Sequence, residues 1–416
     1  MAHDREREPL EFTSEISDDD LYHLTSSPAP PSRFTRLTRP ILDFAREKWQ
    51  SKGAQYTKLN LLSDRTESPK RWVQMVQSIV TAPRFRRYVV VYLSLVVVCF
   101  VGWKYFLFPR LKENSAILSS LDPKEKAHVG GWFGANALPD LEGMVQLREL
   151  DKALLPAAAA PEEEEGEGSS RRLVFIGDVH GCKTELEKLL KKVNFNPETD
   201  HLIFTGDLIQ KGPDSLGVID LARSYNASSV RGNHEDRVLT LRQDMIAANI
   251  TDDSFDYVHP QDAKSRQLAR DLSPEQAEWL NALPVILDIG QVPNIGRVVV
   301  AHAGIVPGVE LDKQDPWSVM NMHTIDLPTH VPSSDRKKGV KWTKLFNKHQ
   351  SLSLESRNIV TTVIYGHDSK NGLNIQDYTK GLDSGCVKGG KLTALVITDG
   401  GAQEIVQVGC KKYHGK

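Results

Sequence analysis

The sequence predicts a layered α/β fold for the C-terminal part of the chain, residues 171–416. Short apolar runs, RLVFI, HLIF, RVVVA and TTVIY, each lead into a glycine turn, as buried strands do. Helix-like stretches such as CKTELEKLLKKV separate these runs. Strands that alternate with helices are typical of layered α/β domains. The remaining residues precede this domain and differ from it in composition.

Residues 1–83 are expected to form a disordered tail. Stretches such as DREREPLEFTSEISDDD and TSSPAPPSRFTRLTRP are polar, charged and rich in proline, with few apolar side chains to bury. Within the tail, the tetrapeptide YTKL (residues 56–59) resembles a tyrosine-type sorting signal, a pattern that is also common by chance.

Residues 88–108 form an apolar run that is predicted to be a transmembrane helix. Lys104 carries the only charge in the run and lies near one end, where its long side chain can reach the interface. About 20 apolar residues span the hydrocarbon layer of a bilayer. A buried core helix is the alternative, but such a helix is seldom apolar on every face.

The charges around this run favour a cytosolic N-terminus. More lysine and arginine precede the run than follow it: Lys70, Arg71, Arg84, Arg86 and Arg87 against Lys104, Arg110 and Lys112. Two N-glycosylation sequons, at Asn226 and Asn249, are accessible only in a translocated chain. We therefore expect a single-pass type II membrane protein whose large C-terminal domain is lumenal.

Residues 109–170 are expected to be a juxtamembrane stalk and linker. The stretch 131–156 is predicted to contain a short helix that packs on the following domain, and AAAAPEEEEGEGSS reads as a solvated acidic linker. Three cysteines follow the apolar run. A disulfide between Cys386 and Cys410 and free buried thiols are both open.

Polar side chains follow the predicted strands at the glycine turns. They are Asp178 and His180 in GDVHG, Asp207 in GDL, Asn233 and His234 in GNHE, His302 in HAG and His367 in GHD. The carboxyl ends of strands are where ligand sites of α/β sheets form. Carboxylates, an amide and imidazoles together suit zinc, manganese or iron. Burial of so many polar groups is costly unless they have partners, so we expect one site.

These five blocks, in this order, resemble the calcineurin-like metallophosphoesterases, in particular the branch with phosphoprotein phosphatases and diadenosine tetraphosphatases. The stretch LDSGCVKGGKLTAL is similar to the latter group. The resemblance implies two β-sheets packed as a sandwich between helices. It also implies two divalent metal ions, with zinc favoured over magnesium and with manganese, cobalt or iron as alternatives. The implied metal ligands are Asp178, His180, Asp207, Asn233, His302 and His367.

The resemblance also implies the catalytic roles. Asp207 bridges the two ions, which together activate a water molecule for attack on phosphorus. His234 is the candidate general acid, or else orients the attacking group, and Glu235 is expected to make a supporting contact.

Residues Gln210 and Lys211 depart from the phosphoprotein phosphatase pattern, which has Asp and Arg there. Without that carboxylate, the pKa of His234 should be lower than in that class. Without the two-point arginine fork, Lys211 contacts phosphate as a flexible point charge. This disfavours a phosphoprotein substrate. Lys211 and Arg231 are the predicted substrate-binding residues, and a basic set could line a groove for a polyanion: Lys264, Arg266, Arg336, Lys337, Lys338, Lys341 and Lys344.

The expected activity is hydrolysis of phosphoanhydride bonds in inorganic polyphosphate. Together with the membrane topology, the motifs are most similar to the fungal vacuolar endopolyphosphatases of this family, which implies the vacuole membrane with the domain in the lumen. Hydrolysis of diadenosine polyphosphates or of phosphoproteins is the alternative, and purine stacking would require an aromatic residue such as Trp317 or Trp342. The net charge of −2 gives no general attraction to nucleic acid.

Overall fold

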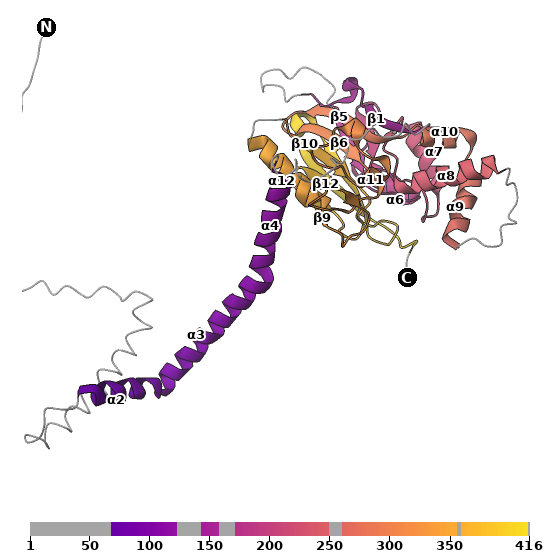
Figure 1. Cartoon of the computed structure of the whole chain (residues 1–416). Coiled ribbons are helices and arrows are strands. Elements are labelled where there is room, and N and C mark those ends of the chain that lie inside the picture. Colours follow the sequence, from indigo (N-terminus) through magenta and orange to yellow (C-terminus); the bar gives the residue numbers. More distant parts are fainter. Residues whose placement is uncertain (1–67, 123–142, 158–170, 249–259, 356–358, 415–416) are drawn as a thin grey trace, which may run out of the picture. The chain divides into compact units, whose positions relative to one another are not determined.

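The computed structural model describes residues 68–122, 143–157, 171–248, 260–355 and 359–414 (Figure 1). The sorting-signal tetrapeptide 56–59, most of the predicted tail and the sequon at Asn249 lie outside these ranges. The chain divides into two units, Met1–Cys99 and Phe100–Lys416, and each is described by itself.

The first unit contains α2 (Ser68–Val80) and most of α3 (Pro83–Gly102). α2 lies within residues 1–83, which the sequence predicts to be a disordered tail. The helical run continues from α3 through η2 (Trp103–Leu107) and α4 (Phe108–Ser120). From Pro83 to Ser120 this run is long and apolar enough to cross a membrane, and its most apolar window has a mean hydropathy of 2.0 with no residue buried. That it crosses one stays a prediction.

The second unit contains two mixed β-sheets. The six-stranded sheet has the order β1-β5-β6-β10-β12-β11 and the five-stranded sheet the order β14-β13-β2-β3-β4. The strands of the first are β1 (Val145–Glu149), β5 (Pro284–Val292), β6 (Gly296–Ala301), β10 (Thr361–Tyr365), β11 (Asn374–Ile375) and β12 (Thr379–Gly381). Those of the second are β2 (Arg172–Ile176), β3 (Asp200–Phe204), β4 (Ser228–Ser229), β13 (Lys391–Ile397) and β14 (Gln403–Gly409).

An apolar layer between the two sheets joins them. Leu173 and Phe175 of β2 share this layer with Leu287 of β5, Val300 of β6 and Ile364 of β10, all buried. The alternate residues of β2, Val174 and Ile176, belong to a different cluster, as expected when successive side chains of a strand point to opposite faces. The strands that carry the predicted ligands therefore come from both sheets.

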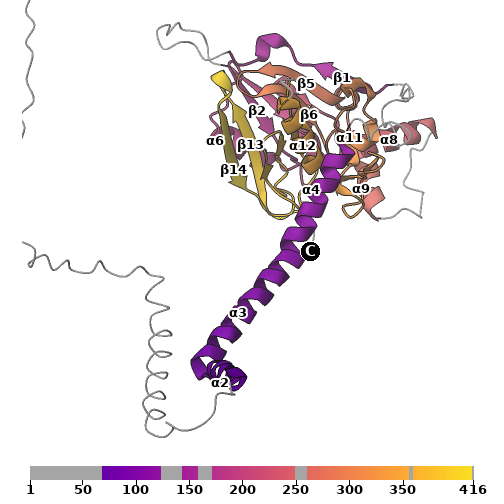
Figure 2. The ribbon, with the colours of Figure 1, turned by 60° about the vertical axis from the view of Figure 1, so that its left-hand side comes forward.

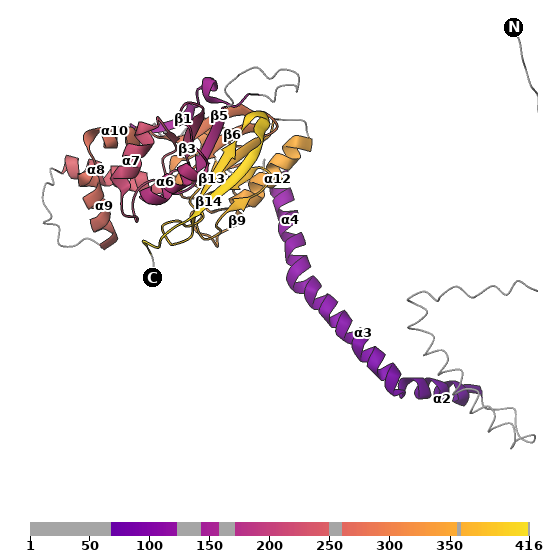
Figure 3. The same cartoon turned by 180° about the vertical axis from the view of Figure 1, so that it is seen from behind.

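Helices cover the outer faces of both sheets. The cluster outside the five-stranded sheet includes residues of α6 (Lys183–Lys192), α7 (Ser215–Ser224), α8 (Asn233–Ala247), α9 (Pro260–Asp271) and α10 (Pro274–Asn281). The cluster outside the six-stranded sheet includes residues of α4, α11 (Pro316–Asn321) and α12 (Trp342–Glu355). Figure 2 shows α12 and α11 beside β6, and Figure 3 shows α6 beside β13 and β14, which it contacts. The α/β prediction is confirmed.

Two features of the fold differ from the predictions. The described part of 131–156 forms β1, which pairs in parallel with β5, and the short 3-10 turn η3 (Lys152–Leu154) instead of the predicted α-helix. A third, small sheet, β8-β7-β9, was not predicted; its strands are β7 (Thr324–Ile325), β8 (Pro332–Ser333) and β9 (Val340–Lys341). Of the two open states of Cys386 and Cys410, the structure has the disulfide.

The apolar layer between the sheets makes a prediction for stability. The Phe175→Ala substitution removes a fully buried ring there and should lower the free energy of unfolding by roughly 3–5 kcal/mol. Ile405→Ala on β14, at a side chain that is 36% exposed, is the control and should cost less than about 1 kcal/mol. Denaturant unfolding of the two variants measures the difference. Equal losses would contradict this account of the core.

Candidate metal centre

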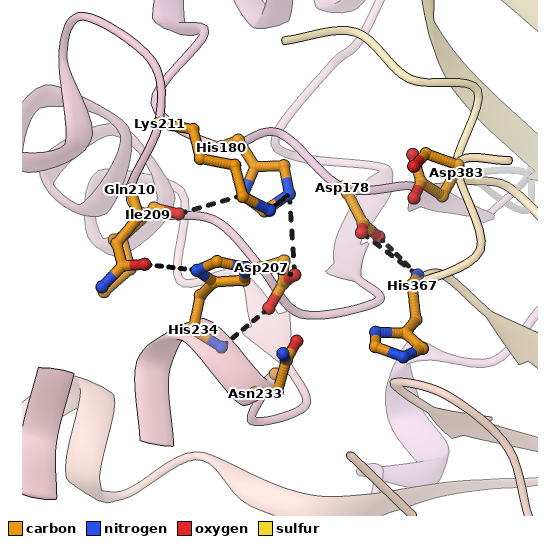
Figure 4. Close-up of polar contacts among 12 residues, drawn as sticks. Asp178, His180, Asp207, Ile209, Gln210, Lys211, Asn233, His234, His367 and Asp383 are labelled. Atoms are coloured by element: carbon orange, nitrogen blue, oxygen red, sulfur yellow. Dashed lines mark hydrogen bonds and ion pairs between the residues drawn. The ribbon is translucent and has the colours of Figure 1, made fainter. Parts of the chain in front are cut away.

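The predicted polar residues gather around one cavity. Five of the six predicted ligands line it, and His302 is fully buried behind it. The lining residues are Asp178, His180, Asp207, Lys211, Asn233, His234, His323, Arg336, His367, Ser369, Asp383, Gly385, Val387 and Lys388. In Figure 4, Asp207 lies between a group formed by His180 and His234 and a group formed by Asp178, His367 and Asp383.

Three imidazole rings turn the same edge toward the centre. The Nδ1 atoms lie close to oxygens on the outer side: His180 Nδ1 is 3.1 Å from the Ile209 carbonyl oxygen, and His302 Nδ1 is 2.8 Å from that of Thr205. His234 Nδ1 contacts the amide oxygen of Gln210. An Nδ1–H that donates outward leaves the Nε2 lone pair facing the cavity, which is how histidine ligands of metals are held.

Asp207 is the carboxylate to which these rings point. Its oxygens lie 3.3 Å from His302 Nε2, 3.6 Å from His180 Nε2 and 3.8 Å from His234 Nε2. Burial would raise the pKa of Asp207, but the neighbouring imidazoles outweigh it and hold that pKa well below its usual range. Asp207 is therefore ionised, as a bridging ligand must be.

Potential ligand atoms converge in two overlapping groups. Those of His180, Asp207 and His234 lie within 4.8 Å of one another, and so do those of Asp207, His302 and His367. Asp207 belongs to both groups, which fits the predicted bridging role. The first group contains His234 where the prediction has Asp178.

Asp178 lies on the opposite side of Asp207 from His180 and His234 (Figure 4). Both of its oxygens accept the backbone N–H of His367, at 3.1 Å. Burial raises the pKa of Asp178 well above its usual range, and the nearby carboxylates of Asp383 and Asp207 add to the rise. Three carboxyl groups in one buried place repel one another, and cations among them would remove that repulsion.

The Asn233 side chain can present either amide atom to the centre of the cavity. With its oxygen inward, the amide places that oxygen 3.0 Å from His302 Nε2, so two acceptors face each other. With the amide reversed, its nitrogen donates to His302 and to Asp207 instead. The inward oxygen is favourable when a cation lies between the acceptors. The orientation of the rings and the convergence of ligand atoms on Asp207 fit divalent metal ions.

Gln210 occupies the place beside His234 that the sequence analysis gave to a missing acid. Its oxygen contacts His234 Nδ1, and its amide nitrogen donates to Ser265 Oγ of α9 at 2.9 Å. Burial lowers the pKa of His234 to about 4. A low pKa of His234 was expected, because the neutral amide of Gln210 adds no negative charge to stabilise an imidazolium ion.

The left-handed backbone is concentrated at this site. Positive φ angles occur at His180 (50°), Asp207 (52°), Gln210 (70°), Lys211 (65°) and His367 (65°). Each non-glycine residue in this region costs roughly 1–3 kcal/mol, a strain that proteins retain mainly at functional sites. The surrounding hydrogen bonds hold these turns in place.

The two predicted substrate-binding residues differ in position. Lys211 lines the cavity, and its ammonium group lies 2.9 Å from His180 Nε2. Arg231 is buried and faces away: it donates to the backbone and side-chain oxygens of Asn281 at 2.9 Å and pairs with Asp236. Contact with a substrate would break these bonds. Arg231 is not among the described residues that line the cavity, and its substrate role stays a prediction.

The predicted basic set contributes one residue to the cavity. Among the described lining residues, Arg336 comes from that set, and it forms an ion pair with Asp368. Lys341 donates to the side chain of Asn371, and Lys344 pairs with Glu113 of α4. Four lining residues were not predicted from the sequence: His323, Ser369, Asp383 and Lys388. His323 stacks on His367, with ring centroids 4.5 Å apart, and burial lowers the pKa of His323 to about 4.

Gly366 yields a test of the site geometry. A Cβ atom there would lie 2.0 Å from Asp178 Oδ1 and 2.7 Å from Thr205 Oγ1, so Gly366→Ala must displace Asp178. We expect the variant to bind zinc or manganese at least about tenfold more weakly than the native chain, measured as metal content after dialysis. Gly409→Ala, where a Cβ atom meets nothing within 4 Å, is the matched control. Unchanged metal content in Gly366→Ala would contradict the assigned geometry.

Comparison with known proteins places the chain among phosphoesterases. The chain is 28% identical to a symmetrical bis(5'-nucleosyl)-tetraphosphatase of Baumannia cicadellinicola, over 58% of this chain and 94% of that protein. It is 29% identical to the zinc-dependent endopolyphosphatase of Saccharomyces cerevisiae, over 55% and 76% of the two chains. The match to the tetraphosphatase of Pectobacterium carotovorum has 39% identity but covers 33% of this chain and 44% of that protein.

Among solved structures, a putative diadenosine tetraphosphatase is 30% identical with a TM-score of 0.46, over 62% of this chain and 99% of that one. The family model for calcineurin-like phosphoesterases matches residues 171–391, more than half of the chain. The chain belongs to the calcineurin-like phosphoesterase family and is a metal-dependent phosphoesterase.

Proposed function

We propose that this protein hydrolyses the phosphoanhydride bonds of inorganic polyphosphate. The observation that carries the proposal is the composition of the cavity: a buried floor of carboxylates and imidazoles, with the cations Lys211, Arg336 and Lys388 lining the same space. A floor of this kind suits a pair of divalent ions. The cations suit a substrate with negative charge beyond the reacting phosphate.

In this proposal Asp178, His180, Asp207, Asn233, His302 and His367 hold two divalent metal ions, and zinc is favoured by the imidazole-rich ligand set. When bound, such ions activate water and neutralise the oxygens of the phosphate under attack. Asp207 belongs to both groups of potential ligands and would therefore contact both ions. His234 faces the same space with Nε2, where it orients the attacking water or gives a proton to the leaving oxygen.

The neutral amide of Gln210 beside His234 suits a phosphoanhydride substrate. When a phosphoanhydride bond breaks, the leaving group is a phosphate anion, which is stable without a proton. A phosphoserine instead releases an alkoxide, which needs a strong proton donor. An amide beside His234, in place of a carboxylate, therefore disfavours a protein phosphatase and remains compatible with cleavage of anhydrides.

The lining favours polyphosphate over dinucleoside polyphosphates. None of the described residues that line the cavity is Trp, Tyr or Phe, whereas recognition of a purine draws on aromatic stacking. Neither Trp342 nor Trp317 can stack on a purine in the cavity. Trp342 is buried against Phe346 and Tyr365, and Trp317 is 54% exposed and does not line the cavity. Cleavage of diadenosine tetraphosphate is the second candidate, favoured by the Baumannia relative, 94% of which this chain covers.

A substrate panel tests the proposal. The chain, loaded with zinc or manganese, should cleave long polyphosphate faster than diadenosine tetraphosphate or a phosphopeptide, and gel analysis should show intermediate lengths if cleavage is internal. Asp207→Asn should lower kcat at least about 100-fold, since loss of a residue that merely supports a ligand typically costs 10–100-fold. Lys191→Gln, at an exposed position on α6, is the control and should keep full activity. Preference for diadenosine tetraphosphate would refute the polyphosphate assignment.

We also propose that the apolar run 88–108, within the helix from Pro83 to Ser120, anchors the protein in the vacuole membrane with the catalytic unit in the lumen. The support is its apolar surface and the excess of positive charge before it. Asn226, the described sequon, is exposed at the end of α7, where a glycan would have room.

This topology predicts a glycan on Asn226. In a eukaryotic host, an endoglycosidase should increase the gel mobility of the full chain, and Asn226→Gln should reduce that shift. The Asn321→Gln variant, which changes an asparagine outside any sequon, should migrate like the native chain. Absence of any shift, together with protease protection of the N-terminus instead of the catalytic unit, would contradict the orientation.

A further inference from the structure

Lys388 is one of three cations, with Lys211 and Arg336, among the described residues that line the cavity. It lies in the loop between β12 and β13, and its side chain is exposed although it lines the cavity. Its ammonium group donates to Ser369 Oγ at 2.7 Å. Asp178 and Asp207, by contrast, are buried. Lys388 therefore belongs to the mouth of the cavity rather than to its floor.

The loop that carries Lys388 is held rigidly. Within it, Lys388 N–H donates to the Gly385 carbonyl at 3.0 Å, and Gly389 N–H donates to Cys386 at 2.8 Å. The Cys386–Cys410 disulfide ties the loop to the C-terminal segment. Tyr413 and His414 each donate a backbone N–H to the Val387 carbonyl at 2.9 Å. A fixed loop places the base of the lysine side chain reproducibly beside the site.

The second anchor of Lys388 comes from the loop that carries a metal ligand. Ser369 follows His367 by two residues, and Asp368 between them pairs with Arg336. One short loop thus positions His367, Arg336 and Lys388 together. Both cations line the same cavity as His367.

The charge of Lys388 is available to a ligand. Within the described residues, neither Lys388 nor Lys211 forms an ion pair with a carboxylate, whereas Arg336 has Asp368. The neighbouring His414 reports the local positive field: burial lowers its pKa, and Lys211, Lys264 and Lys388 lower it further. A lysine that contacts a hydroxyl group can exchange that contact for a phosphate oxygen at little cost.

We propose that Lys388 is a specificity-determining residue that binds the phosphate next to the reacting one, so that the site selects a chain of phosphates. This inference rests on the proposed function. A substrate with one phosphate, such as p-nitrophenyl phosphate, would occupy the floor and leave Lys388 without a ligand. Polyphosphate would occupy the floor and also contact Lys388. The contribution of Lys388 should therefore depend on the number of phosphates in the substrate.

The test compares Lys388→Gln, Lys388→Arg and the native chain on two substrates. For long polyphosphate, Lys388→Gln should raise KM about tenfold, the scale of one lost charge-assisted hydrogen bond, and Lys388→Arg should restore most of the loss. For p-nitrophenyl phosphate, kcat and KM should stay within about twofold in all variants. Lys391→Gln, an exposed lysine at the start of β13 that does not line the cavity, is the matched control.

A structural role for Lys388 predicts a different pattern. If Lys388 only holds the loop of His367 through Ser369, then Ser369→Ala and Lys388→Gln should both lower kcat on the two substrates alike, and the inference is overturned. It is also overturned if Lys388→Gln and Lys391→Gln have the same KM for polyphosphate while the native chain cleaves it; the proposed function then survives. If the native chain does not cleave polyphosphate, the proposed function fails, and this inference fails with it.

Discussion

The carboxylate of Glu235 is the constraint on which the site depends. It is fully buried and accepts four backbone N–H groups: those of Asp207 and Gly232 at one oxygen, and those of Leu208 and Ile209 at the other, at 2.8–3.2 Å. Asp207, Leu208 and Ile209 belong to the turn after β3, and Gly232 is the N-cap of α8. One side chain thus locks the turn that carries Asp207 to the helix end that carries Asn233 and His234. The supporting contact expected of Glu235 is confirmed.

The sandwich explains why residues distant in sequence can meet there. Asp178 and His180 follow β2, and Asp207 follows β3, both strands of the five-stranded sheet. His302 follows β6 and His367 follows β10, strands of the six-stranded sheet. The apolar layer between the sheets fixes the two sets of strand ends against each other. Packing of that layer therefore supports both the stability of the domain and the geometry of the site.

Much of the floor of the cavity could be predicted because its signal is local. An apolar run, a glycine and a polar residue specify a strand end, and the close approach of backbones explains the glycines: a Cβ atom at Gly232 would lie 2.3 Å from Asp207 Oδ1. Arg231 precedes the same glycine and was assigned to the substrate, but sequence does not show which way a side chain leaves a turn. The partner that turns it away, Asn281, is 50 residues distant.

The mouth of the cavity could not be predicted for a related reason. His323, Ser369 and Lys388 lie in loops whose paths depend on long-range contacts, among them the Cys386–Cys410 disulfide that the sequence left open. The strand β1 was missed because VQLRE is short and lies at a sheet edge, where pairing with β5 outweighs local preference. Strand ends are set by nearby residues, whereas loops and edges are set by the whole fold.

Anomalous X-ray diffraction from crystals equilibrated with zinc or manganese tests the central claim most directly. The account predicts two peaks about 3.5–4 Å apart on either side of the Asp207 carboxylate, with His180 bound to one ion and His302 and His367 to the other. A single peak, or a pair that leaves Asp207 uncoordinated, would contradict it.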